Sequence, residues 1–145
     1  MISLRNLQRR VPLDLPWLRR FAAIAFEECA RACGDGRFAL KQLDEVGVAI
    51  VSDRRISEVH EEFMGLAGAT DVITFEHGDI VISAETARAN AARFGQRVDR
   101  EVALYIVHGL LHLNGFDDTE PRARRRMHAA QARVMSACLR RANVG

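Results

Sequence analysis

The residues best suited to chemistry lie in one short stretch, V-H-G-L-L-H-L-N-G-F-D-D-T-E, from Val107 to Glu120. His108 and His112 are four residues apart, so on a helix their rings lie side by side on one face, where a single tetrahedral ion can bridge them. Zinc proteases share this spacing but carry a general-base glutamate directly after the first histidine, and here that position is Gly109. The pattern predicts a metal site that lacks this glutamate.

A third ligand has to come from the chain that follows the helix. Gly115 can adopt the left-handed conformation that ends a helix, and the residues beyond it, Asp117 and Asp118, then fold back toward the histidines. A lone histidine in an apolar helix usually belongs to the core. Two histidines on one polar stripe, followed by glycine and two aspartates, favour metal binding over packing.

The helix that positions the histidines is predicted to run from an N-cap at Asp99 to about Asn114. On a helical wheel this segment is apolar almost all round, which is typical of a helix at the centre of a core. A preceding helix is capped by Ser83 and ended by Gly95, and a last helix begins at Pro121.

The first half of the chain contributes the strands. Alternating or β-branched runs predict strands at residues 2–7 and 46–51, and T-D-V-I-T-F and D-I-V-I-S predict a hairpin between residues 70 and 83. Two more helices are expected: one from Trp17 to Cys33, stopped by Gly34, and one capped by Ser52 with Ile56, Val59 and Phe63 on its inner side. The fold class is therefore α+β, a single domain over residues 1–145 in which a small mixed sheet of about four strands packs with about five helices.

Composition limits the classes of protein. A chain of 145 residues with 48% hydrophobic content buries a core without disulfides or a structural metal, so a metal here would serve function. No run approaches the roughly 20 apolar residues that span a bilayer, and the N-terminus lacks a signal-peptide core. We expect a cytoplasmic protein with no membrane partner, whose cysteines, Cys29, Cys33 and Cys138, are small buried apolar residues.

Positive charge gathers at the two ends of the chain. Residues 1–20 hold five arginines against one aspartate, residues 119–145 hold seven against one glutamate, and the stretch between them is acidic. Arginines of the last helix, above all Arg122, Arg125 and Arg126, are predicted to bind phosphate groups, and the alternative is a solvated helix face.

Two motifs carry a family resemblance. H-G-L-L-H-L-N-G-F-D-D resembles the H-G-x-L-H-L-x-G-[YF]-D-H signature of the YbeY family, the bacterial endoribonucleases of ribosomal RNA maturation. T-D-V-I-T-F and G-D-I-V-I-S, residues 70–75 and 78–83, look like the family's P-T-D-V-L-S-F and L-G-D-I-V-I-S. The resemblance implies one zinc ion per chain held by three side chains, a groove for single-stranded RNA, and association with the small ribosomal subunit and its assembly factors. It also implies that the phosphates bound by Arg122, Arg125 and Arg126 are those of RNA, and no DNA partner is expected.

The sequence departs from the family pattern at two positions. Asp118 stands where the family has its third histidine ligand, and Met64 stands where it has an arginine. The predicted metal ligands are therefore His108, His112 and Asp118, and this set leaves the site at +1 instead of +2. Both departures weaken the attraction for a phosphodiester. Met64 is expected to fill space beside His60, and candidates to replace the arginine are Arg54, Arg55 and Arg122.

Three functions are compatible with these residues. A single-strand-specific, metal-dependent endoribonuclease of 16S ribosomal RNA maturation and ribosome quality control fits best. One alternative is a weak or inactive ribosome-assembly binding protein that keeps the metal site, for which Met64 and Asp118 are the support. A metallopeptidase is the third, although it lacks the glutamate at Gly109 and Glu101 lies two turns away.

Overall fold

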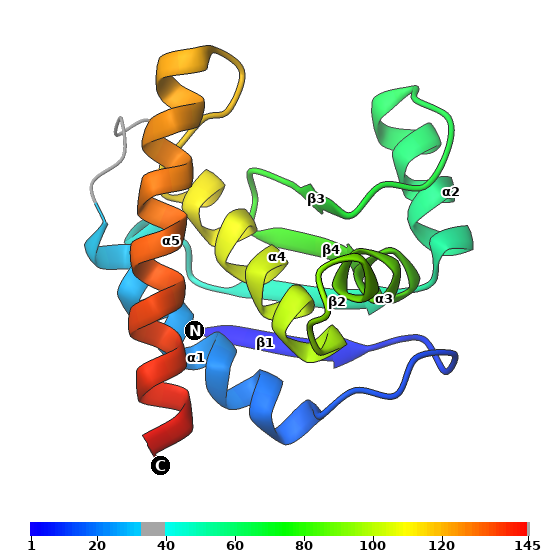
Figure 1. The fold of residues 1–145 in the computed structure, drawn as a ribbon. Helices are drawn as coiled ribbons and strands as arrows, with labels where there is room; N and C mark the ends of the chain where they lie inside the picture. The colour runs from blue at the N-terminus through cyan, green and yellow to red at the C-terminus, as the bar shows by residue number, and fades with distance from the viewer. Residues whose placement is uncertain (33–39, 145) are drawn as a thin grey trace.

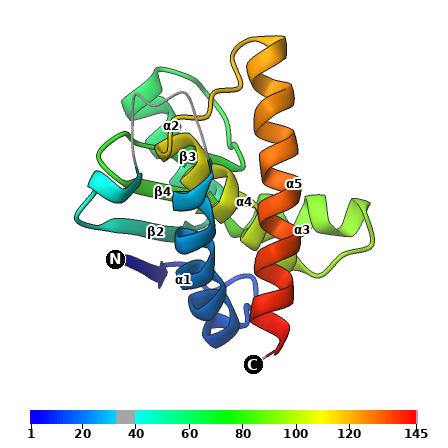
Figure 2. The ribbon, with the colours of Figure 1, turned by 90° about the vertical axis from the view of Figure 1, so that its left-hand side faces the viewer.

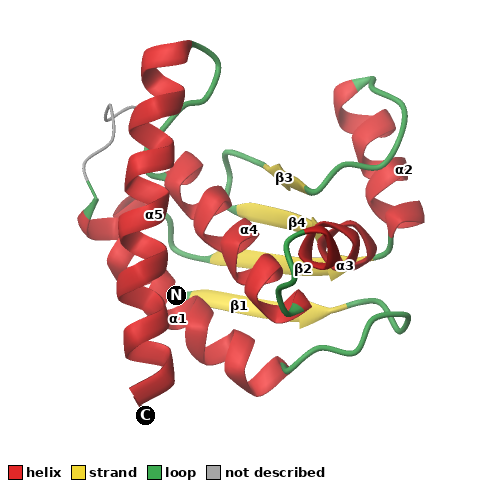
Figure 3. Cartoon of the chain, in the orientation of Figure 1, coloured by secondary structure: helices red, strands yellow, loops and turns green. Residues whose placement is uncertain are grey.

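The computed structural model describes residues 1–32 and 40–144, and its centre is one mixed sheet (Figures 1 and 3). The strands are β1 (Ile2–Asn6), β2 (Val46–Val51), β3 (Val72–Thr74) and β4 (Asp79–Ser83), in the spatial order β1-β2-β4-β3. β1, β2 and β4 are parallel neighbours, and β3 pairs antiparallel with β4. The predicted hairpin and the mixed four-stranded sheet of an α+β fold are confirmed.

Five α-helices and one short turn of 3-10 helix, Leu40–Gln42, complete the described part of the chain. The helices are α1 (Leu15–Arg31), α2 (Asp53–Met64), α3 (Ala84–Arg93), α4 (Val98–Leu113) and α5 (Pro121–Val144). The predicted caps Ser52 and Ser83 accept backbone hydrogen bonds at the starts of α2 and α3. None of the described helices has the length and apolarity needed to cross a membrane.

Successive side chains of a strand point to opposite faces of the sheet, so the core has two layers. Val48, Ile50, Ile80 and Ile82 face a large cluster shared with α1, α3, α4 and α5, whereas the smaller cluster around Val51 packs under α2. α4 lies in the middle of the large cluster and contacts α1, α3, α5, β3 and β4. The long α5 stands beside α1 and α4 (Figure 2). α4, which carries His108 and His112, is therefore held in place by contacts on several sides.

Three expectations about the elements need correction. Asp99 is not an N-cap, because α4 begins at Val98 and the buried Asp99 carboxylate instead accepts hydrogen bonds from the backbone N–H of Asp14 and from Arg97. Phe63 is 61% exposed, because it lies at the rim of the sheet, where its ring packs edge-on against Phe75.

The third correction concerns the first long helix. It starts at Leu15 after the N-cap Asp14, two residues before Trp17, and ends at Arg31. The predicted stop at Gly34 lies outside the described residues, and so does Cys33. Cys29 and Cys138 are buried, as expected.

Candidate metal centre

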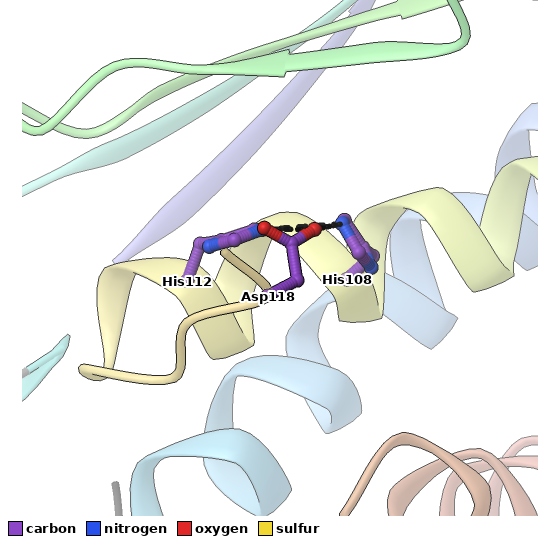
Figure 4. A group of neighbouring side chains, drawn as sticks. All are labelled: His108, His112 and Asp118. Atoms are coloured by element: carbon purple, nitrogen blue, oxygen red, sulfur yellow. Dashed lines mark hydrogen bonds and ion pairs between the residues drawn. The ribbon is translucent and has the colours of Figure 1, made fainter. Parts of the chain in front are cut away.

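The last two turns of α4 bring His108 and His112 together (Figure 4). Their ring centroids are 4.7 Å apart, and the two Nε2 atoms are 3.2 Å apart. The side chains are mostly buried, with exposed fractions of 24% and 27%. The i, i+4 spacing thus produces the paired imidazoles that the sequence predicts.

Asp118 completes the cluster from the loop after α4. Its Oδ2 atom lies 3.5 Å from Nε2 of His112 and 3.8 Å from Nε2 of His108, and all three ligand atoms fall within 4.8 Å of one another. Ligands held tetrahedrally at zinc distances of about 2.0–2.2 Å are themselves roughly 3.3–3.6 Å apart. The spacing and the chemistry of these three donors therefore fit a tetrahedral ion with one position left open.

The loop returns because Gly115 adopts a φ of 93°, in the left-handed region. The N–H of Phe116 then donates to the carbonyl of Leu111 at 3.0 Å, and the Phe116 side chain is buried in the core. These contacts bring the next residues back over the last turn of α4.

Asp117 and Asp118 have different roles. The Asp117 carboxylate accepts hydrogen bonds from the backbone N–H and the hydroxyl of Thr119, at 3.0 and 2.8 Å, and these bonds lower the pKa of Asp117. Asp117 therefore shapes the loop, and Asp118 is the aspartate that faces the histidines.

Each histidine also has a partner on its other ring nitrogen. Nδ1 of His112 lies 3.1 Å from the carbonyl oxygen of Phe116, and Nδ1 of His108 lies 2.9 Å from Oε1 of Gln131 on α5. Burial lowers the pKa of His108, an effect that the Gln131 contact and the Asp118 charge oppose. His108 thus remains a neutral ligand at lower pH than an exposed histidine does.

A cleft of about 760 Å³ opens above the three candidate ligands, between the loop after α4 (residues 115–118), β3 and the end of α2. Met64 lines this cleft and is 49% exposed, so the expectation that it fills space in the packing is wrong. Arg54 and Arg55 pair with Glu58 on α2, and the described residues that line the cleft include no arginine or lysine. The candidate replacements Arg54, Arg55 and Arg122 therefore lie outside the cleft.

Arg122, Arg125 and Arg126 are exposed on the first turns of α5, directly after the loop that carries Asp118. Their role in binding RNA remains a prediction. Two contacts at the site, those of Gln131 and Arg124, were not predicted from the sequence. Arg124 donates from Nε to the backbone carbonyl of Asp118 at 3.3 Å. Both contacts depend on how α5 packs, which spacing along the chain does not reveal.

The fold and the site define an α+β protein with a three-ligand candidate metal centre beside an open cleft. Comparison of the sequence with protein families matches residues 18–138 to the family described as Endoribonuclease YbeY. The match covers most of the chain, and the chain belongs to this family.

Curated relatives agree with the family match. The chain is 37% identical over 103 residues to Endoribonuclease YbeY of Phocaeicola vulgatus, covering 66% of this chain and 75% of that protein. It is 35% identical over 121 residues to the protein of the same name from Micrococcus luteus, covering 72% and 77%. The solution structure of TM1509 from Thermotoga maritima superposes with a TM-score of 0.66 at 24% identity, covering 95% of this chain and 89% of that one. The last comparison supports the fold.

Proposed function

We propose that this protein is a metal-dependent endoribonuclease that cuts single-stranded RNA in the cytoplasm, in 16S ribosomal RNA maturation and ribosome quality control. One zinc ion per chain would be held by His108, His112 and Asp118. The convergence of these three donors in an open cleft carries the proposal, together with membership of a family named for endoribonuclease activity. The small ribosomal subunit and its assembly factors are the proposed partners.

The candidate ligands and the α5 arginines have different roles in this proposal. His108, His112 and Asp118 leave one side of the site open to the cleft, where a phosphodiester can approach. A bound zinc ion supplies a Lewis acid for a phosphoryl oxygen. Arg122, Arg125 and Arg126 on α5 provide positive charge that holds the RNA backbone next to the site.

The negative charge of the cleft implies that the bound zinc ion also contributes to RNA binding. Four carboxylates line the cleft, those of Asp71, Glu76, Asp117 and Asp118, and no arginine or lysine of the described chain joins them. This lining repels a polyanion, so the ion and the α5 arginines have to offset it. We expect removal of the metal to weaken RNA binding as well as cleavage.

The test is a cleavage assay on a labelled single-stranded RNA and its duplex. Protein is assayed as purified, after chelation, and after zinc is restored, with casein as a parallel substrate. The proposal predicts cuts within the single strand that chelator abolishes and zinc restores, with casein intact. Cleavage that survives complete removal of metal would overturn it, and so would intact RNA with zinc bound, the result expected of an assembly protein.

The structure gives a reason to set the metallopeptidase aside. Gly109 occupies the general-base position of that class and packs directly against the buried Ile80, so a glutamate has no room there. Glu101 is buried lower on α4, where it interacts with Tyr105. No other described carboxylate on α4 lies at the position that peptidase chemistry requires.

A further inference from the structure

Gln131 connects α5 to the metal centre. It is half-buried and lies 23 residues after His108 in the chain, yet its Oε1 is 2.9 Å from Nδ1 of that histidine. This hydrogen bond joins a side chain of α5 directly to the histidine pair. Its place directly behind a candidate ligand indicates a role at the site.

An amide oxygen only accepts, so the proton of the neutral His108 ring is held on Nδ1. The Nε2 lone pair then points at the place where Nε2 of His112 and Oδ2 of Asp118 converge, 3.2 and 3.8 Å away. His112 is held in the same tautomer by the backbone carbonyl of Phe116. A side chain therefore fixes one ligand, and the loop that carries the third ligand fixes the other.

We propose that Gln131 is a positioning residue of the metal centre, which orients His108 for the ion without adding charge. The proposal rests on the metal site of the proposed function. Carboxylates commonly hold metal-binding histidines in this way. Here the negative charge already sits at Asp118, and a second carboxylate behind His108 would reduce the site from +1 to 0. The neutral amide keeps the positive charge that attracts a phosphodiester.

Two substitutions separate orientation from charge. Gln131→Leu removes the acceptor at similar volume and is expected to weaken zinc binding by about 10- to 100-fold, measured by competition with a chromophoric chelator. Gln131→Glu keeps an acceptor oxygen, so zinc affinity equals or exceeds that of the wild type, whereas RNA cleavage at saturating zinc falls. Gln96→Leu, an exposed glutamine on the loop before α4, is the matched control and leaves zinc affinity unchanged.

Nitrogen-15 NMR of the ring in metal-free protein at mildly alkaline pH provides a readout without RNA or zinc. Wild type and Gln131→Glu should show the His108 proton on Nδ1, and Gln131→Leu should show a mixture of tautomers. A proton on Nε2 of wild-type His108 would overturn the proposal, as would unchanged zinc affinity in folded Gln131→Leu. If Gln131→Leu does not fold, the His108 tautomer of the wild type and the zinc affinity of Gln131→Glu still test the proposal. Failure of RNA cleavage alone would refute the nuclease and leave these results standing.

Discussion

Gly109→Ala probes the packing of the histidine helix against the sheet. Gly109 lies between the two candidate histidine ligands on the side of α4 that faces β4. A Cβ atom added there would lie 2.9 Å from both Cδ1 and Cγ2 of Ile80 and 3.1 Å from Cγ1. Ile80 is 0% exposed, so its side chain cannot swing into solvent, and either the helix or the strand has to move.

Two effects of opposite sign set the size of the change. Overpacking a core costs about 1–3 kcal/mol. Replacing glycine by alanine within a helix contributes about 1 kcal/mol of stability. The net is a loss of about 0–2 kcal/mol, and because three atoms of one enclosed side chain are contacted, we expect the upper half of that range.

Urea unfolding of metal-free wild type and Gly109→Ala measures this difference. Ile80→Val removes Cδ1, so the double variant should lose less stability than the sum of the two single variants. A Gly109→Ala protein more stable than wild type by about 1 kcal/mol, as helix propensity alone predicts, would refute the packing that the structure shows. Strict additivity with Ile80→Val would refute the named contact.

Three further outcomes are expected from the site. Changing Arg122, Arg125 and Arg126 together to Gln should weaken single-stranded RNA binding and flatten its salt dependence. Changing the exposed Arg19 and Arg88 to Gln should do neither. Equal salt slopes for all variants would mean that the α5 arginines are only a solvated face. The pKa of His108 lies below its usual 6.5 when the protein is folded, so below pH 6.5 the unfolded chain binds more protons than the folded one. The free energy of unfolding of metal-free protein should therefore fall as the pH drops below 6.5, and it should fall less in His108→Gln. Identical pH profiles of the two proteins in urea titrations would contradict the shift. Asp118→His with Met64→Arg makes the charge facing the cleft more positive and should speed RNA cleavage at neutral pH under saturating zinc. The measurement is the single-turnover cleavage rate. Normal metal binding with no faster cleavage would show that the site is tuned in another way.

Local signals in the sequence predicted much of this architecture. The caps Ser52 and Ser83, the hairpin and the i, i+4 histidines depend on residues within a few positions of one another, where helix and turn geometry decides the outcome. The return of the loop after Gly115 also follows from local backbone freedom.

The errors and omissions share a different physical origin. Asp99 looks like a cap but bonds to the N-terminus of α1, and Gln131 shows no pattern that points to His108. Met64 and Phe63 are apolar and were expected inside, yet α2 ends at the rim of the sheet, where both are exposed. Each depends on how distant elements pack, and periodicity along one helix carries no information about its partners.

The metal content of the purified protein and of His112→Ala tests the central claim most directly. Elemental analysis should find one equivalent of zinc per chain in the wild type and almost none in the variant. Circular dichroism should show both folded, because the core does not depend on the ion. His128→Ala, an exposed histidine on α5 outside the cleft, should keep its zinc. Equal zinc in wild type and His112→Ala would contradict the assignment of His108, His112 and Asp118 as the metal centre.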